Sequence, residues 1–199
     1  MKKIITISRE FGAGGGEIGE RLAKELGYVC YNKELILKAA SESNADMKSI
    51  MKWDEKIPAD FGNTKSLLDF YNIPLSDRLF ECQQQVIREF GEKGNCVIIG
   101  RNGNHVLKEF DNCLHVFIHA DPHWRLKRMK KKMPDVSESK ISEQIRSIDK
   151  MRKKYCTYYT NTEFGNSENY DICLNTSRLG ISTCLDILVK LVRENEKRK

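Results

Sequence analysis

Four glycines lie close together near the start of the chain, between an apolar run that predicts a strand and a pattern that predicts a helix. Glycine can adopt positive φ, and without a side chain its backbone can wrap closely around an anion. The first amides of a helix lack intrahelical partners and lie at the positive end of its dipole. The segment therefore predicts an oxyanion site, most often one for phosphate, formed by Gly12, Ala13, Gly14, Gly15, Gly16 and Glu17. The alternative is an ordinary strand-to-helix turn.

This loop departs from the common phosphate-binding pattern G-x-x-x-x-G-K-[ST]. If Gly14 is aligned with the second glycine of that pattern, Gly15 replaces the lysine and Gly16 replaces the hydroxyl residue. Glu17 follows and would bring a negative charge close to bound phosphates. The lysine normally supplies positive charge to the outer phosphates, so another cation must replace it or phosphoryl transfer is weak or absent.

A second candidate feature is the strongly basic segment 125–154, which holds twelve Lys or Arg against four Asp or Glu. Such a segment can be a solvated helix face, a nucleic-acid patch or a set of arms that close on phosphates. It has few aromatic residues before Tyr155 and matches no recognised nucleic-acid module, which disfavours the second alternative. His115, His119 and His123 are spaced by four, but they fall on a predicted strand end and a helix start, so no metal site is expected.

The elements that must position these residues alternate between short β-branched runs and longer helical patterns, which indicates a parallel α/β architecture. Strands are predicted at 4–7, 28–31, 96–99, 115–118 and 170–175. Helices are predicted at 15–26, from the N-cap Asn32 onward, and at 76–90, from 121 onward, 137–155 and 180–193. Residues 44–75 show no clear pattern, and no repeat or domain boundary is evident, so one domain spanning 1–199 is expected.

Composition places the chain among globular proteins, with 40% hydrophobic and 31% charged residues in 199. It has no apolar run long enough to span a membrane and no signal-peptide pattern at its start, so a cytoplasmic location is expected. The seven cysteines are scattered and include no CxxC pair. In a reducing compartment we expect those in strand-like surroundings to be small buried hydrophobic residues, namely Cys30, Cys96, Cys113 and Cys173.

The segment Ile-Ser-Arg-Glu-Phe-Gly-Ala-Gly-Gly, residues 7–15, resembles the opening signature of the cytidylate kinase-like family. The resemblance covers nearly the whole chain and continues, in order, at 31–36, 97–101, 116–121, 148–152 and 170–177. It implies a P-loop NTPase fold of three α/β/α layers, with a five-stranded parallel sheet. It also implies a substrate-binding arm at about 40–75 and a helical lid at about 125–165.

The resemblance also accounts for the missing lysine, because the family's loop typically lacks it and carries an arginine that matches Arg9. Two positions depart from the family pattern. Gly16 stands where relatives often carry arginine, and Asn32 stands where aspartate is more usual. Gly100 and Arg101 match the first two residues of the family's G-R-D segment, in which the arginine binds the acceptor's phosphate.

The activity implied is phosphoryl transfer from ATP to a nucleoside monophosphate, with CMP or dCMP as the first expectation, or to another small acceptor. Arg9, Arg125 and Arg128 would then supply the charge that the lysine normally gives. Asn32, Arg101, Asp149 and Arg152 would bind the acceptor. Mg²⁺ would be held through the phosphates, with no protein ligand named, and a homodimer is an open alternative to a monomer. The competing interpretation is a catalytically weak nucleotide- or anion-binding protein that keeps the kinase fold.

Overall fold

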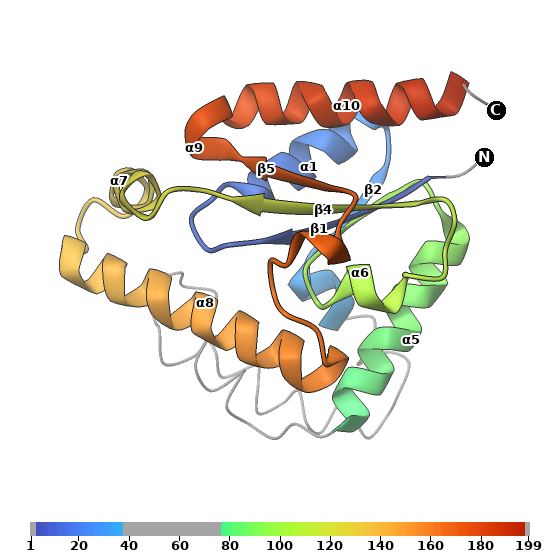
Figure 1. The fold of residues 1–199 in the computed structure, drawn as a ribbon, viewed down its shortest axis with the longest axis horizontal. Coiled ribbons are helices and arrows are strands. Elements are labelled where there is room, and N and C mark those ends of the chain that lie inside the picture. The colour runs from blue at the N-terminus through green and yellow to red at the C-terminus, as the bar shows by residue number, and fades with distance from the viewer. Residues whose placement is uncertain (1–2, 38–76, 198–199) are drawn as a thin grey trace.

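The fold is built on a parallel β-sheet between two layers of helices (Figure 1). The structure, a computed structural model, describes residues 3–37 and 77–197, so the expected arm at about 40–75 lies outside the described residues. The five strands are β1 (Ile4–Arg9), β2 (Val29–Tyr31), β3 (Cys96–Ile99), β4 (Cys113–His119) and β5 (Ile172–Asn175). All pairs are parallel and the spatial order is β2-β3-β1-β4-β5. The predicted five-stranded parallel sheet is therefore confirmed.

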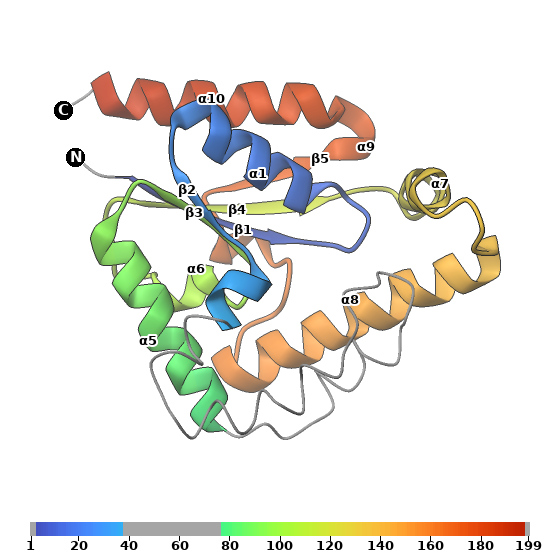
Figure 2. The same ribbon diagram turned by 180° about the vertical axis from the view of Figure 1, so that it is seen from behind.

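Helices cover both faces of this sheet, as the two opposite views show (Figures 1 and 2). On one face lie α1 (Gly15–Leu26), α9 (Thr176–Leu179) and α10 (Ile181–Lys197). On the other side lie α5 (Asp77–Lys93), α6 (Gly103–Val106) and α8 (Glu138–Thr160). The short α7 (Pro122–Lys132) follows β4 and precedes α8, and the 3-10 turn η1 (Ser167–Asn169) leads into β5.

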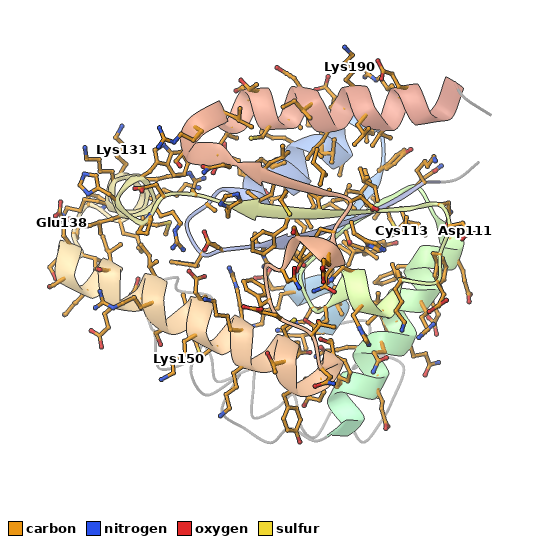
Figure 3. All side chains as sticks on the ribbon, in the orientation of Figure 1. Asp111, Cys113, Lys131, Glu138, Lys150 and Lys190 are labelled. Carbon is orange, nitrogen blue, oxygen red and sulfur yellow. The ribbon has the colours of Figure 1, made fainter. Side chains whose placement is uncertain are left out.

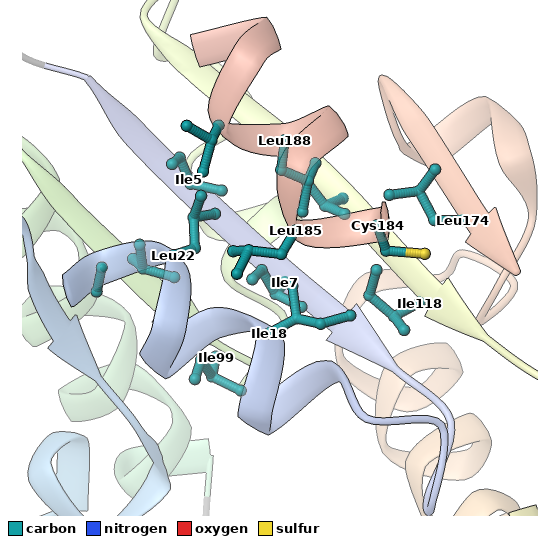
Figure 4. Packing of buried hydrophobic residues seen from close by; sticks show 14 of the residues in the cluster. Ile5, Ile7, Ile18, Leu22, Ile99, Ile118, Leu174, Cys184, Leu185 and Leu188 are labelled. Atoms are coloured by element: carbon teal, nitrogen blue, oxygen red, sulfur yellow. The ribbon is translucent and has the colours of Figure 1, made fainter. Parts of the chain in front are cut away.

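Two apolar clusters of the core share the strands of the sheet, and a smaller one lies between α7 and α8. Ile5 and Ile7 pack with residues of α1 and α10. Ile4 belongs to the other cluster and packs with residues of α5 and α6. Side chains alternate along a strand, and both faces are buried here, which explains why the central strands are continuous apolar runs. In the first cluster, Ile18 and Leu22 of α1 interdigitate with Leu188 of α10 and are fully buried (Figure 4).

Local signals in the sequence correctly placed most element starts. Asn32 accepts a hydrogen bond from the amide of Leu35 at 3.1 Å, which confirms its predicted N-cap role. Asp121 caps α7 by accepting from the amides of His123 and Trp124. The predicted helix 137–155 was too short, because α8 continues to Thr160, and its last turns pack Tyr159 against Phe80 with ring centroids 4.0 Å apart.

The prediction that four cysteines are buried is confirmed at Cys96, is met only in part at Cys30 and Cys113, and is wrong at Cys173. All seven thiols are free, and Cys96 is buried, where desolvation raises its pKa to about 12. Cys30 and Cys113 are partly buried, whereas Cys173 is exposed. The reason is that β5 is an edge strand whose side chains alternate, so Leu174 packs into the core while Cys173 faces outward. Within the two described ranges, no helix is long and apolar enough to cross a bilayer.

His115 provides a test of how the sheet face is stabilised. Its Nδ1 lies 2.8 Å from Thr6 Oγ1, and burial lowers the pKa of His115 despite the opposite effect of Asp171. In the unfolded chain the imidazole has its ordinary pKa of about 6.5 and takes up a proton more readily. The folded state is therefore expected to lose stability as pH falls below about 6.5.

Urea denaturation at pH 7.5 and at pH 5.5 would measure this loss, and His115→Asn should make it smaller. The exposed His123 offers the matched control, since His123→Asn should leave the difference between the two pH values unchanged. An equal pH dependence in wild type and His115→Asn would contradict the assignment.

Candidate active site

The predicted phosphate loop lies between the end of β1 and the start of α1, at the carboxyl edge of the sheet. Gly12 and Gly14 have φ of +80° and +91°, which is the left-handed region that glycine enters at no steric cost. Gly14 precedes α1 without any side-chain cap, and the first intrahelical bond runs from the amide of Ile18 to the carbonyl of Gly14. The amides that precede Ile18 in the helix thus have no intrahelical acceptor and can bind an anion.

Sterics explain why this loop has no lysine. A Cβ added at Gly15 would lie 2.5 Å from Cβ of Arg9 and 3.4 Å from Cβ of Ile118. Any side chain at position 15 would therefore have to displace Arg9, the last residue of β1, or α1 itself. At Gly16, in contrast, an added Cβ would meet nothing within 4 Å. The lysine position is therefore occupied in space by the stem of Arg9, and the next position faces open space.

Arg9 connects the loop to the end of β3. Its stem packs against Gly15, and its guanidinium lies directly over Gly100, where an added Cβ would overlap it. Gly100 has φ of +80°, and the two residues after it, Arg101 and Asn102, also have positive φ of 56° and 52°. Consecutive non-glycine residues in this conformation store strain of the kind found at binding sites. Both are nevertheless buried, each with 8% of its surface exposed.

A small pocket opens where these segments meet α8. Three arginines, Arg9, Arg101 and Arg152, line it, and among the described residues that line it none is acidic. The guanidinium of Arg101 lies over the ring of Tyr155, 5.7 Å from its centroid. The remaining lining residues are Ser8, Gly100, Asn102 and Phe164. The free space of about 30 Å³ is less than a nucleoside needs, so this pocket suits an anionic group of a ligand rather than a whole ligand.

A buried ion pair ties the α7–α8 segment to the phosphate loop. Arg125 pairs with Oδ2 of Asp149, donates to the carbonyl of Phe11 at 3.1 Å and lies 3.7 Å from Glu10 Oε2. The other oxygen of Asp149 accepts from the amide of Phe11 at 2.7 Å. Both side chains are largely buried, 7% exposed for Arg125 and 12% for Asp149. Asp149, expected at the acceptor, is thus engaged by the loop and by α7.

Arg128 and Arg152 also bind the backbone of the loop. Arg128 lies one turn after Arg125 and donates to the carbonyl of Gly12 at 3.3 Å, while its Nη2 lies 2.5 Å from Glu17 Oε2. Arg152 donates to the carbonyl of Arg9 at 2.8 Å and lies 4.0 Å from Asp149 Oδ1. The structure therefore brings Arg125 and Arg128 to the loop and Arg152 to Arg9 at the end of β1, and Arg101 lines the pocket beside Arg9 and Arg152.

The basic segment 125–154 separates into two groups in three dimensions. Arg125, Arg128 and Arg152 face the loop, whereas lysines such as Lys131 and Lys150 extend away from the protein (Figure 3). Asn32 caps the helix after β2 and does not line the arginine pocket within the described part of the chain. The same part contains no group of three or more side chains suited to holding a metal.

Two residues that the sequence analysis did not single out support the loop. Glu10 accepts from the amide of Ala120 at 3.1 Å, which joins the loop to the end of β4. Thr176 is fully buried, and its hydroxyl donates to the carbonyl of Ala13 at 2.7 Å. Thr176 follows a predicted strand, so its position was foreseeable, but its partner, 163 residues earlier in the chain, was not.

The model of the cytidylate kinase-like family matches residues 4–178. The chain belongs to the cytidylate kinase-like family. The matched range includes the phosphate loop, the arginine pocket and both helices of the α7–α8 segment, and it ends before α10. No curated protein sequence shows significant similarity to the chain.

Several solved structures share this fold. A crystal structure of a protein from Eubacterium ventriosum is 27% identical, with a TM-score of 0.73, covering 96% of this chain and 99% of that one. Shikimate kinase from Bacteroides thetaiotaomicron is 13% identical, with a TM-score of 0.54, covering 97% and 99%. The YorR protein from Bacillus subtilis, solved with phosphorylated GDP, is 16% identical, with a TM-score of 0.52, covering 98% of each chain. The similarity to shikimate kinase and to the YorR protein shows a shared fold alone.

Substitutions at the two neighbouring glycines should have opposite effects on stability. Gly16→Ala adds a methyl group in open space within a helix and should raise the free energy of unfolding by about 0.4–1 kcal/mol. Gly15→Ala forces the methyl group into Arg9 and should lower it by about 1–3 kcal/mol. Chemical denaturation measures both. Equal effects would contradict the tight packing of Arg9 on α1.

Removing the charge of Asp149 should destabilise the α7–α8 segment strongly. Asp149→Asn leaves the buried Arg125 without its closest counter-charge and should cost about 3 kcal/mol of unfolding free energy. The exposed pair of Lys190 and Glu194 is the control, and Glu194→Gln should change stability by less than about 0.5 kcal/mol. A cost for Asp149→Asn as small as that of the control would show that the buried pair is not holding the segment.

Proposed function

We propose that the protein is an ATP-dependent phosphotransferase that transfers a phosphoryl group to a small anionic acceptor, with CMP or dCMP as the first candidates. The observation that carries this proposal is the position of Arg9. Its stem packs on the amide-rich loop and its guanidinium reaches the pocket of Arg101 and Arg152. A donor phosphate on the loop and an acceptor anion in the pocket would therefore meet at one guanidinium.

Phosphoryl transfer requires little covalent chemistry from protein groups. An oxygen of the acceptor attacks the γ-phosphorus of ATP while the bond to the β–γ bridging oxygen breaks, and negative charge spreads over the transferring group. The helix amides at Gly15 and Gly16 would hold the donor phosphates, and Arg9 would neutralise the transferring group. Arg101 and Arg152 would fix the acceptor by bidentate bonds. Arg128, at the mouth of the loop, would add charge on the donor side.

The described residues contain no cluster of side chains suited to holding Mg²⁺. The ion would arrive bound to the phosphates of ATP, and none of the steps above depends on a protein ligand for it.

We further propose that α7 and α8 act as the lid. The seven free thiols are consistent with a cytoplasmic location, where a kinase would meet ATP.

A second candidate is a binding protein that keeps the fold and has lost efficient chemistry. The observation that favours it is that Arg125, expected to serve the donor phosphates, is held by Asp149, Glu10 and the carbonyl of Phe11. A nucleic-acid role would have to use the exposed lysines of α7 and α8, and the basic segment 125–154 contains no aromatic residue.

Turnover of ATP by the purified protein with a panel of nucleoside monophosphates and other small anionic acceptors tests the proposal. The wild type should phosphorylate at least one acceptor. Arg101→Met and Arg152→Met should each raise the acceptor's KM by about tenfold or more, because each removes a charge-assisted contact. The KM for ATP should change less.

Lys150→Met, on the exposed face of α8, is the matched control and should leave both constants unchanged. No turnover with any acceptor of the panel, combined with stabilisation of the protein by nucleotides in thermal unfolding, would favour the binding protein instead. An unchanged acceptor KM in both arginine variants would reject the pocket as the acceptor site.

A further inference from the structure

Glu17 stands at the mouth of the phosphate loop and is surrounded by positive charge. It is the third residue of α1, and one of its oxygens lies 2.5 Å from Arg128 Nη2 and 3.8 Å from Lys132 Nζ. Its other oxygen lies 3.7 Å from Arg21 Nη1. An acid in the first turn also suits the helix dipole. Helix stability alone, however, does not require an arginine from another helix to close over it.

The position of Arg128 shows what Glu17 competes with. The same guanidinium donates to the carbonyl of Gly12, inside the loop that holds the unpaired amides. The space over Gly16, next to Glu17, is open. A phosphate on the helix amides would therefore lie close both to Arg128, which attracts it, and to the carboxylate of Glu17, which repels it.

We propose that Glu17 is a specificity-determining residue that acts as an internal anion at the phosphate loop. Its carboxylate occupies Arg128 until a ligand displaces it, and it disfavours ligands in proportion to their negative charge. The loop thus selects against free polyphosphates of high charge. This inference rests on the proposed function, because it requires that phosphate ligands bind at the loop.

Binding of inorganic tripolyphosphate and of ATP, measured by titration calorimetry in the presence of EDTA at low ionic strength, tests the proposal. Glu17→Gln should tighten the binding of both by about three- to tenfold, because one negative charge is removed near a multiply charged ligand. The gain should be smaller for orthophosphate. It should also shrink at about 0.5 M salt, where the charges are screened.

Two further variants separate this role from a general change in charge. Glu20→Gln, one turn along α1 on an exposed side chain, makes the same change in net charge and should alter the affinity by less than about twofold. In an Arg128→Gln background, Glu17→Gln should gain less than in the wild type, because no guanidinium is left to be released.

Unchanged or weaker tripolyphosphate binding by Glu17→Gln would overturn the inference, because Glu17 would then serve only to align Arg128. An equal gain in Glu20→Gln would overturn it as well. If neither the wild type nor Glu17→Gln binds ATP or tripolyphosphate, the proposed function fails, and the inference fails with it. These results are distinguishable because the first two require measurable binding by the wild type.

Discussion

The carboxylate of Asp149 holds together three parts of the chain that are far apart in sequence. One oxygen accepts from the amide of Phe11, and the other pairs with Arg125, so the phosphate loop, α7 and α8 meet at one buried group. A buried charge is tolerated only when it is paired and hydrogen-bonded, and this one is both. Because Arg125 also binds the carbonyl of Phe11, the shape of the loop and the position of α7 and α8 depend on the same contact.

Charge is distributed unevenly between the two halves of the site. At the loop, Glu10 and Glu17 lie among the arginines that approach it. The arginine pocket is lined by Arg9, Arg101 and Arg152 and, as far as the described lining extends, by no acid. The carboxylate of Asp149 lies 4.0 Å from Arg152 of the pocket, whereas that of Glu17 lies 2.5 Å from Arg128 at the loop. The loop and the pocket therefore differ in how closely a carboxylate approaches their arginines.

At the position where the common pattern has a lysine, packing leaves no room for a side chain. The stem of Arg9 fills the space beside Gly15, so a side chain at that position would collide with it. Arg9, at the end of β1, brings a cation beside this position. Its guanidinium reaches Gly100, where an added Cβ would overlap it and where φ of +80° favours glycine. Gly15 and Gly100 therefore both leave room for the side chain of Arg9.

Local patterns in the sequence by themselves determined the elements of this protein. The segments predicted as strands became strands of three to seven residues, and Asn32 and Asp121 became helix caps, because these depend on neighbours a few residues away. The family resemblance, rather than spacing, pointed to Arg101, Asp149 and the arginines of the basic segment. Only the tertiary structure decided which cations face the loop, why position 15 is glycine and why Cys173 is exposed. Gly15 packs against Arg9 and Ile118, and Cys173 lies on an edge strand, so both outcomes depend on how the strands are placed in the sheet. The contacts of Arg125, Arg128 and Arg152 with Phe11, Gly12 and Arg9 join residues more than a hundred positions apart, which the parallel crossovers create and no local pattern records.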